Sequence, residues 1–71
     1  MKFIDLYNIL GINQKIEIKR ICGYNFDGEI IYLGFKNSLD KNIFQEISQD
    51  YVDMIYTDEE YKILKIIITG K

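Results

Sequence analysis

Residues 15–28 read KIEIKRICGYNFDG, and this stretch decides the fold that the chain is expected to adopt. Apolar and polar side chains alternate along it, which is typical of a strand with one buried face. The predicted buried face holds Ile16, Ile18, Cys22, Tyr24 and Phe26, and the opposite face holds Lys15, Glu17, Lys19, Asn25 and Asp27. The dipeptide Asp27-Gly28 predicts a tight hairpin turn after the strand, because both residue types tolerate a positive φ.

A two-residue turn at this dipeptide also predicts how the strands on either side pair. Phe26 would face Glu29, Tyr24 would face Ile31, Cys22 would face Leu33, and Arg20 would face Phe35. This register keeps the apolar residues of both strands on one side of the sheet. It also places the Arg20 guanidinium against the Phe35 ring, with the charged end in water.

Two segments with helical spacing flank this hairpin. The first carries an apolar stripe formed by Phe3, Leu6, Tyr7 and Leu10, and Gly11 stands where a helix would end. The second carries a stripe formed by Leu39, Ile43, Phe44 and Ile47, which Ser38 or Asp40 could cap. We therefore expect one short helix before the hairpin and one after it.

A second hairpin is expected after the second helix. Val52, Met54 and Tyr56 would point inward from its first strand, a turn would follow at residues 58–60, and Leu64, Ile66 and Ile68 would point inward from its second strand. The expected fold is α+β, with the order α-β-β-α-β-β in a single domain over residues 1–71. We expect an antiparallel four-stranded sheet of two hairpins, with both short helices on one face.

The composition excludes several classes of protein. The 71-residue chain has one cysteine, no histidine and a formal net charge of -2. We therefore expect no disulfide framework, no metal and no cofactor, and no wrapping of nucleic acid. No stretch approaches the roughly 20 apolar residues of a membrane span, and the amino terminus lacks a signal-peptide pattern, so a cytoplasmic location is expected. A domain this small buries little surface, which favours a homo-oligomer.

The predicted sheet is apolar on both faces, although the face away from the helices is normally polar. The residues expected on that outward face include Ile21, Ile30, Tyr32, Tyr51, Ile55, Tyr61, Ile63 and Ile67. Large exposed apolar patches usually mark interaction sites, so this face predicts a protein-binding surface. The alternative is that a strand slips by one residue, or that the first helix crosses to this face, which would make these residues ordinary core.

Asp58, Glu59 and Glu60 form a carboxylate cluster in the second expected turn. Paired carboxylates can hold magnesium, but this spacing matches no metal loop, and adjacent acids in a turn are usually solvated. As a patch they could imitate phosphates and occupy a basic groove on a partner. With part of the outward face they give the predicted partner-binding set, which is Ile30, Tyr32, Ile55, Tyr61, Ile63, Asp58, Glu59 and Glu60.

No catalytic residue is predicted, so the chain is not expected to be an enzyme. Cys22 lies among apolar neighbours and has no histidine partner, which favours a buried structural thiol. Gly34 is expected to permit close packing or a bulge. A second hypothesis is a nucleic-acid-binding or DNA-nicking module that uses Tyr24, Tyr32, Phe35, Lys19 and Arg20, in one variant with a metal at Asp58 or Glu59.

The segments MKFIDLYNIL (residues 1–10), KIEI (15–18), GEIIYLG (28–34), VDMIY (52–56) and LKIII (64–68) span nearly the whole chain. This pattern of hydrophobic positions around a hairpin resembles short proteins of phages and mobile elements of low-GC bacteria. Some of those proteins are anti-CRISPR or other anti-defence inhibitors, which occupy or disable a host immune protein. The resemblance therefore implies a non-catalytic inhibitor whose partner is a bacterial defence nuclease, such as a CRISPR effector, and it assigns no catalytic residue.

Overall fold

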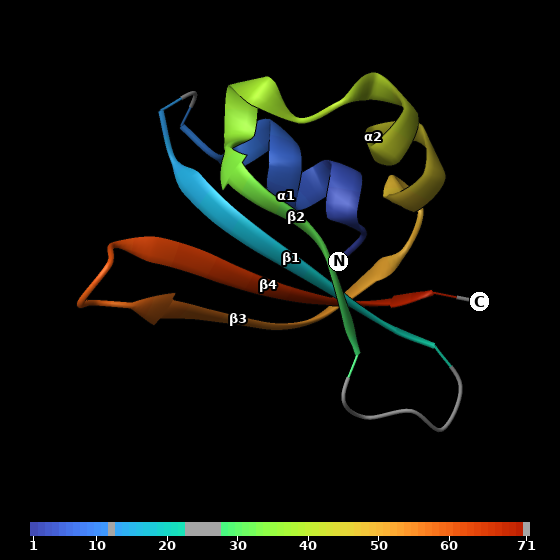
Figure 1. Ribbon diagram of the computed structural model, residues 1–71. Coiled ribbons are helices and arrows are strands. Elements are labelled where there is room, and N and C mark those ends of the chain that lie inside the picture. Colours follow the sequence, from blue (N-terminus) through green and yellow to red (C-terminus); the bar gives the residue numbers. More distant parts are fainter. Residues whose placement is uncertain (12, 23–27, 71) are drawn as a thin grey trace.

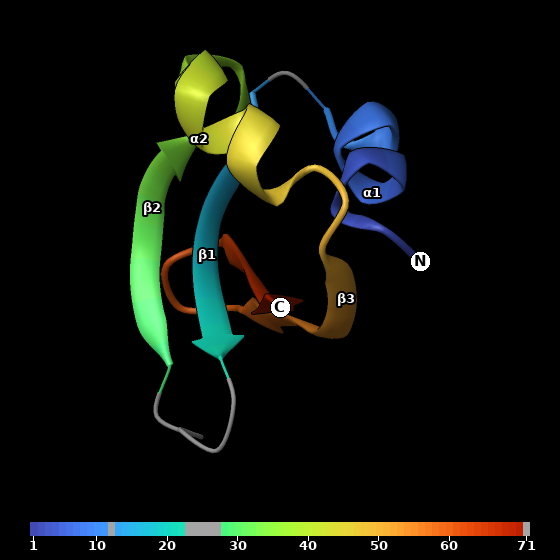
Figure 2. The same ribbon diagram turned by 90° about the vertical axis from the view of Figure 1, so that its right-hand side faces the viewer.

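The computed structural model describes residues 1–11, 13–22 and 28–70, with the backbone alone at Cys22. Its elements are α1 (Phe3–Ile9), β1 (Lys15–Cys22), β2 (Glu29–Phe35), the 3-10 helix η1 (Lys36–Ser38), α2 (Lys41–Ile47), β3 (Tyr51–Asp58) and β4 (Ile63–Gly70). The predicted order of two α-helices and four strands is confirmed. Both helices lie on the same side of the sheet (Figures 1 and 2). The Cys22 thiol, the Tyr24 and Phe26 side chains and the Asp27 turn position lie outside the described residues.

The sheet has the strand order β2-β1-β4-β3 and is mixed. Each hairpin is antiparallel, but β1 and β4 run parallel to each other in the centre of the sheet. The prediction of an antiparallel sheet is therefore wrong. The reason is that α2 carries the chain back across the sheet between the two hairpins, so β2 and β3 start from the same end. The two hairpins then meet through β1 and β4, and these two strands run in the same direction.

Each edge strand contains a β-bulge. In β2, Ile31 is the extra residue, because Tyr32 pairs with Ile18 while Ile30 pairs with Lys19. In β3, Asp53 is the extra residue between the residues that pair with Ile68 and Ile67 of β4. A bulge places two residues of one strand opposite one residue of its partner, so the alternation of faces reverses beyond it.

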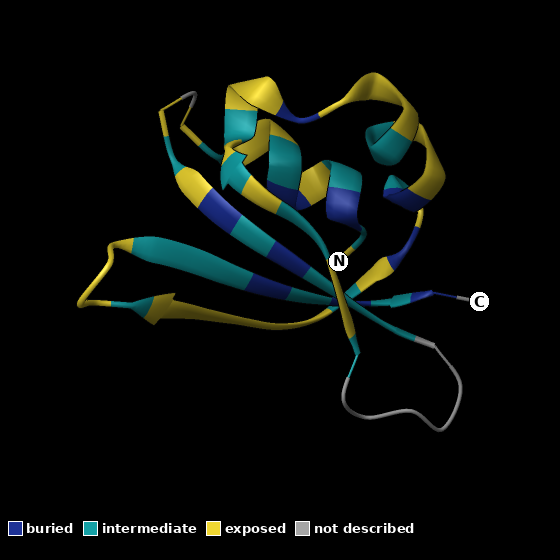
Figure 3. Cartoon of the chain, in the orientation of Figure 1, coloured by how far each residue is buried: buried dark blue, intermediate teal, exposed yellow. Residues whose placement is uncertain are grey.

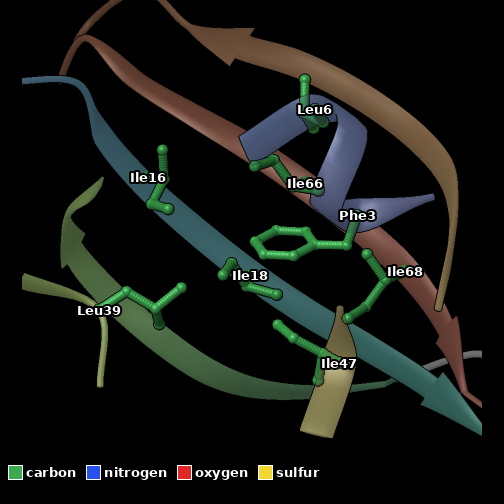
Figure 4. Packing of buried hydrophobic residues seen from close by; sticks show 8 residues of the cluster. All are labelled: Phe3, Leu6, Ile16, Ile18, Leu39, Ile47, Ile66 and Ile68. Carbon is green, nitrogen blue, oxygen red and sulfur yellow. The ribbon is translucent and has the colours of Figure 1, made fainter. Parts of the chain in front are cut away.

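The core lies between the helices and the central strands. Figure 4 shows Phe3 of α1 in the middle of this cluster, facing the sheet. The buried side chains are Phe3, Leu6, Ile16, Ile18, Leu39, Ile47, Ile66 and Ile68. Burying a side chain of this size contributes about 1.5–3 kcal/mol, so the cluster is the main source of stability. The predicted inward orientation is confirmed for Ile16 and Ile18 of β1 and for Leu64, Ile66 and Ile68 of β4, and the predicted apolar stripes of both helices pack in or against this core.

Hydrogen bonds fix the start of each helix. The Asp40 carboxylate accepts from the backbone N–H of Asn42 at 2.7 Å and caps α2, as one of the two expected caps. At the amino terminus, Phe3 donates its backbone N–H to the Asp50 carbonyl at 2.8 Å, and Val52 donates to the Met1 carbonyl at 2.9 Å. These two bonds tie the start of the chain to the beginning of β3.

The predicted register of the first hairpin is wrong. Lys15 pairs with Phe35 and Arg20 pairs with Glu29, so the connection after Arg20 is longer than a two-residue turn. Gly28 does have a positive φ, of 64°. Phe35 lies at the opposite end of β1 from Arg20, which excludes the predicted cation–π contact, and the guanidinium instead contacts Asp50 and Glu46.

Candidate protein-binding surface

The side of the sheet that α1 and α2 leave uncovered is called the outer face below. Directly paired residues project to the same side of a sheet, so the pairing identifies its members. They are Lys15, Glu17, Lys19 and Ile21 on β1; Ile30, Leu33 and Phe35 on β2; Tyr51, Asp53, Met54, Tyr56 and Asp58 on β3; and Ile63, Lys65, Ile67 and Thr69 on β4. The hydrogen bond from the Thr69 hydroxyl to Asp53 and the contact of Lys65 with Glu17 agree with this assignment.

Large apolar side chains line both edges of the outer face. They are Ile30, Leu33 and Phe35 on β2 and Tyr51, Met54 and Tyr56 on β3, and each exposes between 43% and 59% of its surface. Figure 3 colours most of β3 as exposed. The expectation that this side of the sheet is apolar is therefore confirmed, although the bulges change which residues form it.

Charged residues occupy the middle of the outer face. The Lys65 ammonium lies 3.8 Å from the Glu17 carboxylate and 3.8 Å from the Asp58 carboxylate. The same nitrogen lies 5.8 Å from the centre of the Tyr56 ring. Both nitrogen–oxygen distances are longer than a hydrogen bond, so Lys65 and Glu17 attract each other but each can still form a hydrogen bond with another group.

The far end of the β3–β4 hairpin, residues 55–64, is called the arm below, and it extends past both helices (Figure 1). Ile55 pairs with Ile66 and so points to the helix side of the sheet, yet 41% of its surface is exposed. Thr57, on the same side, is exposed as well. Tyr61 stands in the turn with 65% of its surface exposed. The arm is therefore uncovered on both sides.

The turn of the arm is ordered by Asp58. Its Oδ1 accepts from the backbone N–H groups of Glu60 at 3.1 Å and Tyr61 at 3.3 Å. Lys62 closes the turn with a φ of 55°, in the left-handed region. Asp58 thus has a structural role, and the side chains that the turn exposes are Glu59, Glu60, Tyr61 and Lys62.

The structure gathers most of the predicted partner-binding set at the arm. Six of its members lie there, namely Ile55, Asp58, Glu59, Glu60, Tyr61 and Ile63. Ile30 lies on the outer face, at the opposite edge of the sheet. The outward orientation predicted for Ile55 is wrong, because the bulge at Asp53 turns it to the helix side.

Tyr32 is a second residue whose predicted orientation is wrong. The bulge at Ile31 turns it to the helix side, where it packs against the core cluster. Its hydroxyl donates to the Phe35 carbonyl at 2.6 Å. A Cβ on Gly34 would lie 2.8 Å from this hydroxyl, so Gly34 permits close packing, as predicted. Tyr32 is therefore excluded from the outer face.

A polar hollow of about 480 Å³ lies where β1, α2 and the start of β3 meet. It is lined by Lys2, Arg20, Glu46, Gln49, Asp50, Tyr51 and Thr69. Arg20 lies 2.9 Å from Asp50 and 3.1 Å from Glu46, and the Lys2 ammonium donates to Gln49 at 2.9 Å. Both cations of the hollow thus contact groups of the chain itself, which indicates a structural ion-pair cluster.

The residues of the nucleic-acid hypothesis do not form one platform. Lys19 and Phe35 belong to the outer face, whereas Arg20 and Tyr32 lie on the helix side. Tyr24 is outside the described residues. A stacking platform needs aromatic rings beside a basic groove. Here the aromatic and basic residues of the hypothesis are divided between the two faces of the sheet.

Metal-binding groups and membrane-spanning helices are both missing from the described ranges. Within residues 1–11, 13–22 and 28–70, no group of three or more His, Cys, Asp or Glu side chains is placed to hold a metal ion. Neither α1 nor α2, the two α-helices of the described part of the chain, has the length and apolar character to cross a membrane.

Comparison of the chain with known protein families, with curated proteins and with solved structures gives no match in any of the three.

Proposed function

We propose that this chain works by binding another protein through its arm, without catalysing a reaction. The observation that carries this proposal is the exposure of Ile55 and Tyr61 on an element that extends past the helices. Large apolar side chains of this kind supply much of the energy of protein interfaces. The hydrogen bonds of Asp58 hold the turn in one arrangement, so little conformational freedom is lost when a partner binds.

The charges of the arm indicate the chemistry of the partner. Glu59 and Glu60 are exposed beside Tyr61, and Asp58 adds negative charge to the same turn. The exposed Lys62 offsets one of these charges, so the turn remains acidic. A groove with an apolar centre and lysines or arginines at its rim would complement both features. Grooves that hold nucleic-acid phosphates have such cations. This agrees with the more specific proposal that the chain inhibits a bacterial defence nuclease in the host cytosol, which the resemblance to phage proteins implies.

A set of variants tests the arm as the binding surface. The arm variant combines Ile55→Asp with Tyr61→Ala, and the charge variant combines Glu59→Lys with Glu60→Lys. The matched control is Ile9→Asp on α1, where the replaced side chain is 71% exposed and lies outside the arm. Circular dichroism would verify that all four proteins are folded before binding is measured.

The measurement has two stages. Each protein is immobilised and exposed to a bacterial lysate, and a captured protein is then purified and its dissociation constant measured directly. Loss of a hot-spot residue raises the dissociation constant by about 30-fold, so the arm variant should bind at least that much more weakly than the wild type. The Ile9→Asp control should bind like the wild type. Equal binding by the arm variant and the wild type would overturn the proposal.

The nuclease proposal has its own assay. A purified RNA-guided nuclease, loaded with its guide, is mixed with target DNA and increasing amounts of the chain. Inhibition by the wild type that is weakened in the charge variant would support the proposed acidic contact. Binding to a different protein, with no effect on any of the nucleases assayed, would overturn the inhibitor proposal and leave the arm as a binding surface.

A further inference from the structure

One row of residues crosses the outer face in an order that is complementary to its own reverse. The pairing places Leu33, Glu17, Lys65 and Tyr56 side by side on β2, β1, β4 and β3. Read from one edge to the other, the row is apolar, negative, positive and apolar. When the row is reversed, each apolar side chain meets an apolar one, and each charge meets its opposite.

The neighbouring row has a related order. It consists of Ile30, Lys19, Ile67 and Met54, with the bulge residue Asp53 beside Met54. In the reversed row, Ile30 meets Met54, whereas Lys19 meets Ile67, and the Asp53 carboxylate accepts from the Thr69 hydroxyl of its own chain. The central row is thus complementary to itself along its whole length, and the neighbouring row is complementary at its two apolar edges.

We propose that the outer face binds the outer face of a second copy of this chain, with a twofold axis parallel to the strands. Rotation by 180° about such an axis stacks β2 on β3 of the second copy and β1 on its β4. Each row keeps its position along the strand direction, so it faces the same row of the second copy. Twofold interfaces are self-complementary in this sense, because residue i contacts j and j contacts i. Two sheets that stack face to face lie about 10 Å apart, at an angle of about 30°.

The chemistry of the central row favours a second copy over an unrelated apolar partner. Only 16% of the Glu17 side chain and 28% of the Lys65 side chain are exposed, and the 3.8 Å contact between them leaves both able to form closer contacts. An apolar partner would bury both charges without a new counter-charge, which costs several kcal/mol. A second copy supplies Lys65 to Glu17 and Glu17 to Lys65.

The size of the outer face fits a dimer. Strands of about eight residues, with a rise of about 3.3 Å per residue and a spacing of about 4.8 Å, give four strands a face of about 500 Å² in projection. The accessible area is larger, because side chains stand out from the sheet, and a stable interface needs about 800 Å² from each partner. Burial of this face would also add the second apolar layer that a 71-residue domain lacks.

The proposed dimer covers Tyr56, Asp58 and Ile63 of the arm, which belong to the outer face, and leaves Ile55, Glu59, Glu60 and Tyr61 accessible. Ile55 points away from the outer face, and Glu59, Glu60 and Tyr61 stand in the turn beyond it. Because the axis is parallel to the strands, the two turns lie at the same end of the dimer. The dimer therefore presents two arms in the same direction.

The test is a mixing experiment with two charge reversals, Glu17→Lys and Lys65→Glu, measured by sedimentation velocity over a concentration series. The wild type should be dimeric. Each variant alone places like charges against each other twice in the dimer, and its dissociation constant should rise by about tenfold or more. Mixed in equal amounts, the two variants should form a heterodimer with close to wild-type affinity. In that heterodimer positions 17 and 65 are both positive in one chain and both negative in the other, so each charge faces its opposite.

The design of the mixture and two control variants show whether the rescue comes from a contact between chains. The contact between Glu17 and Lys65 within one chain is broken in both variants and stays broken in the mixture, so a contact within one chain cannot restore the dimer. Lys41→Glu reverses a charge on α2, away from the outer face, and should leave the dimer unchanged. Leu33→Asp should give a folded monomer.

Three results would overturn the inference. One is a wild-type protein that is monomeric throughout the concentration series. This result overturns the inference even if Leu33→Asp abolishes binding to a different protein. Another is a dimer that both charge reversals leave intact. The third is a failure of the mixture to restore the dimer, which would exclude this axis. None of these results depends on Ile55 or Tyr61, the two residues changed in the arm variant. The proposed function can therefore be supported or overturned independently of the dimer.

Discussion

Arg20 of β1 lies against Asp50 at the start of β3, with Nε 2.9 Å from Oδ2. The carboxylate is buried, and the N–H direction of this contact departs from that of a good hydrogen bond, so it is chiefly an attraction between charges. Arg20 also reaches Glu46 of α2 at 3.1 Å. One side chain thus connects a central strand with α2 and with the beginning of β3.

Replacement of Asp50 by Asn should lower the free energy of unfolding by about 1–3 kcal/mol, because the Arg20 charge loses its buried counter-charge. The matched control is Glu46→Gln, which removes the exposed partner and should cost less than about 1 kcal/mol. Urea denaturation of the three proteins measures both values. A smaller loss for Asp50→Asn than for Glu46→Gln would contradict the assigned role of the pair.

Replacement of Gly70 by Ala should destabilise the fold through the same cluster. A Cβ at this position would lie 2.8 Å from Arg20 Cζ, so the guanidinium would have to leave its place beside Asp50. Overpacking of this kind costs about 1–3 kcal/mol. Gly11→Ala is the control, because no atom lies within 4 Å of the added carbon.

The Gly70→Ala change can be combined with Asp50→Asn to test the mechanism. Both changes act on Arg20, so their effects on the free energy of unfolding should be less than additive. Additive effects would show that the alanine acts somewhere other than on the Arg20–Asp50 contact.

The central half of the fold can be predicted from the sequence. Ile16 and Ile18 on β1, and Ile66 and Ile68 on β4, are fully buried. They lie in strands that pair with each other without a bulge, so successive residues alternate between the two faces of the sheet. The parallel pairing of these strands cannot be predicted in this way, because the element order does not decide which strands of the two hairpins become neighbours. A central pair of β1 and β3 would have been antiparallel, whereas the observed pair of β1 and β4 is parallel.

The edge strands cannot be predicted in the same way. Simple alternation through Ile31 and Asp53 assigns Leu33, Phe35 and Met54 to the core, but the bulges reverse the faces there and these side chains lie on the outer face. A bulge depends on pairing with the neighbouring strand, and one strand's own sequence contains little sign of it. The turn of the arm is predictable, because a run of acidic residues between two apolar strands is a local feature, whereas the extension of the arm past the helices is not.

Replacement of Tyr32 by Phe tests the bulge in β2. If Tyr32 lies on the helix side, the change removes the hydrogen bond to the Phe35 carbonyl and should cost about 0.5–1.5 kcal/mol. Tyr61→Phe is the control, because the Tyr61 side chain is largely exposed, and its effect should stay within about 0.5 kcal/mol. Thermal or urea unfolding measures the difference. Equal stability of the two variants would argue that Tyr32 points to water, as simple alternation predicts.

Lys62 offers a test of the turn that orders the arm. Among the described residues it is the non-glycine residue with a positive φ, 55°, a conformation that costs an L-residue about 1–2 kcal/mol. Lys62→Gly removes this cost but adds freedom to the unfolded chain, so stability should stay the same or rise by up to about 1 kcal/mol. Lys62→Val should lower it by about 1 kcal/mol or more, because a β-branched side chain tolerates this region poorly.

The control for Lys62→Gly lies in the same turn. Glu60 has no positive φ, so Glu60→Gly adds freedom to the unfolded chain without relieving strain, and should cost about 0.5–1 kcal/mol. Urea denaturation should therefore rank the variants with Lys62→Gly most stable, Glu60→Gly next and Lys62→Val least. A glycine that is equally harmful at both positions would mean that Lys62 does not adopt the left-handed conformation, and that the turn presenting Tyr61 has a different shape.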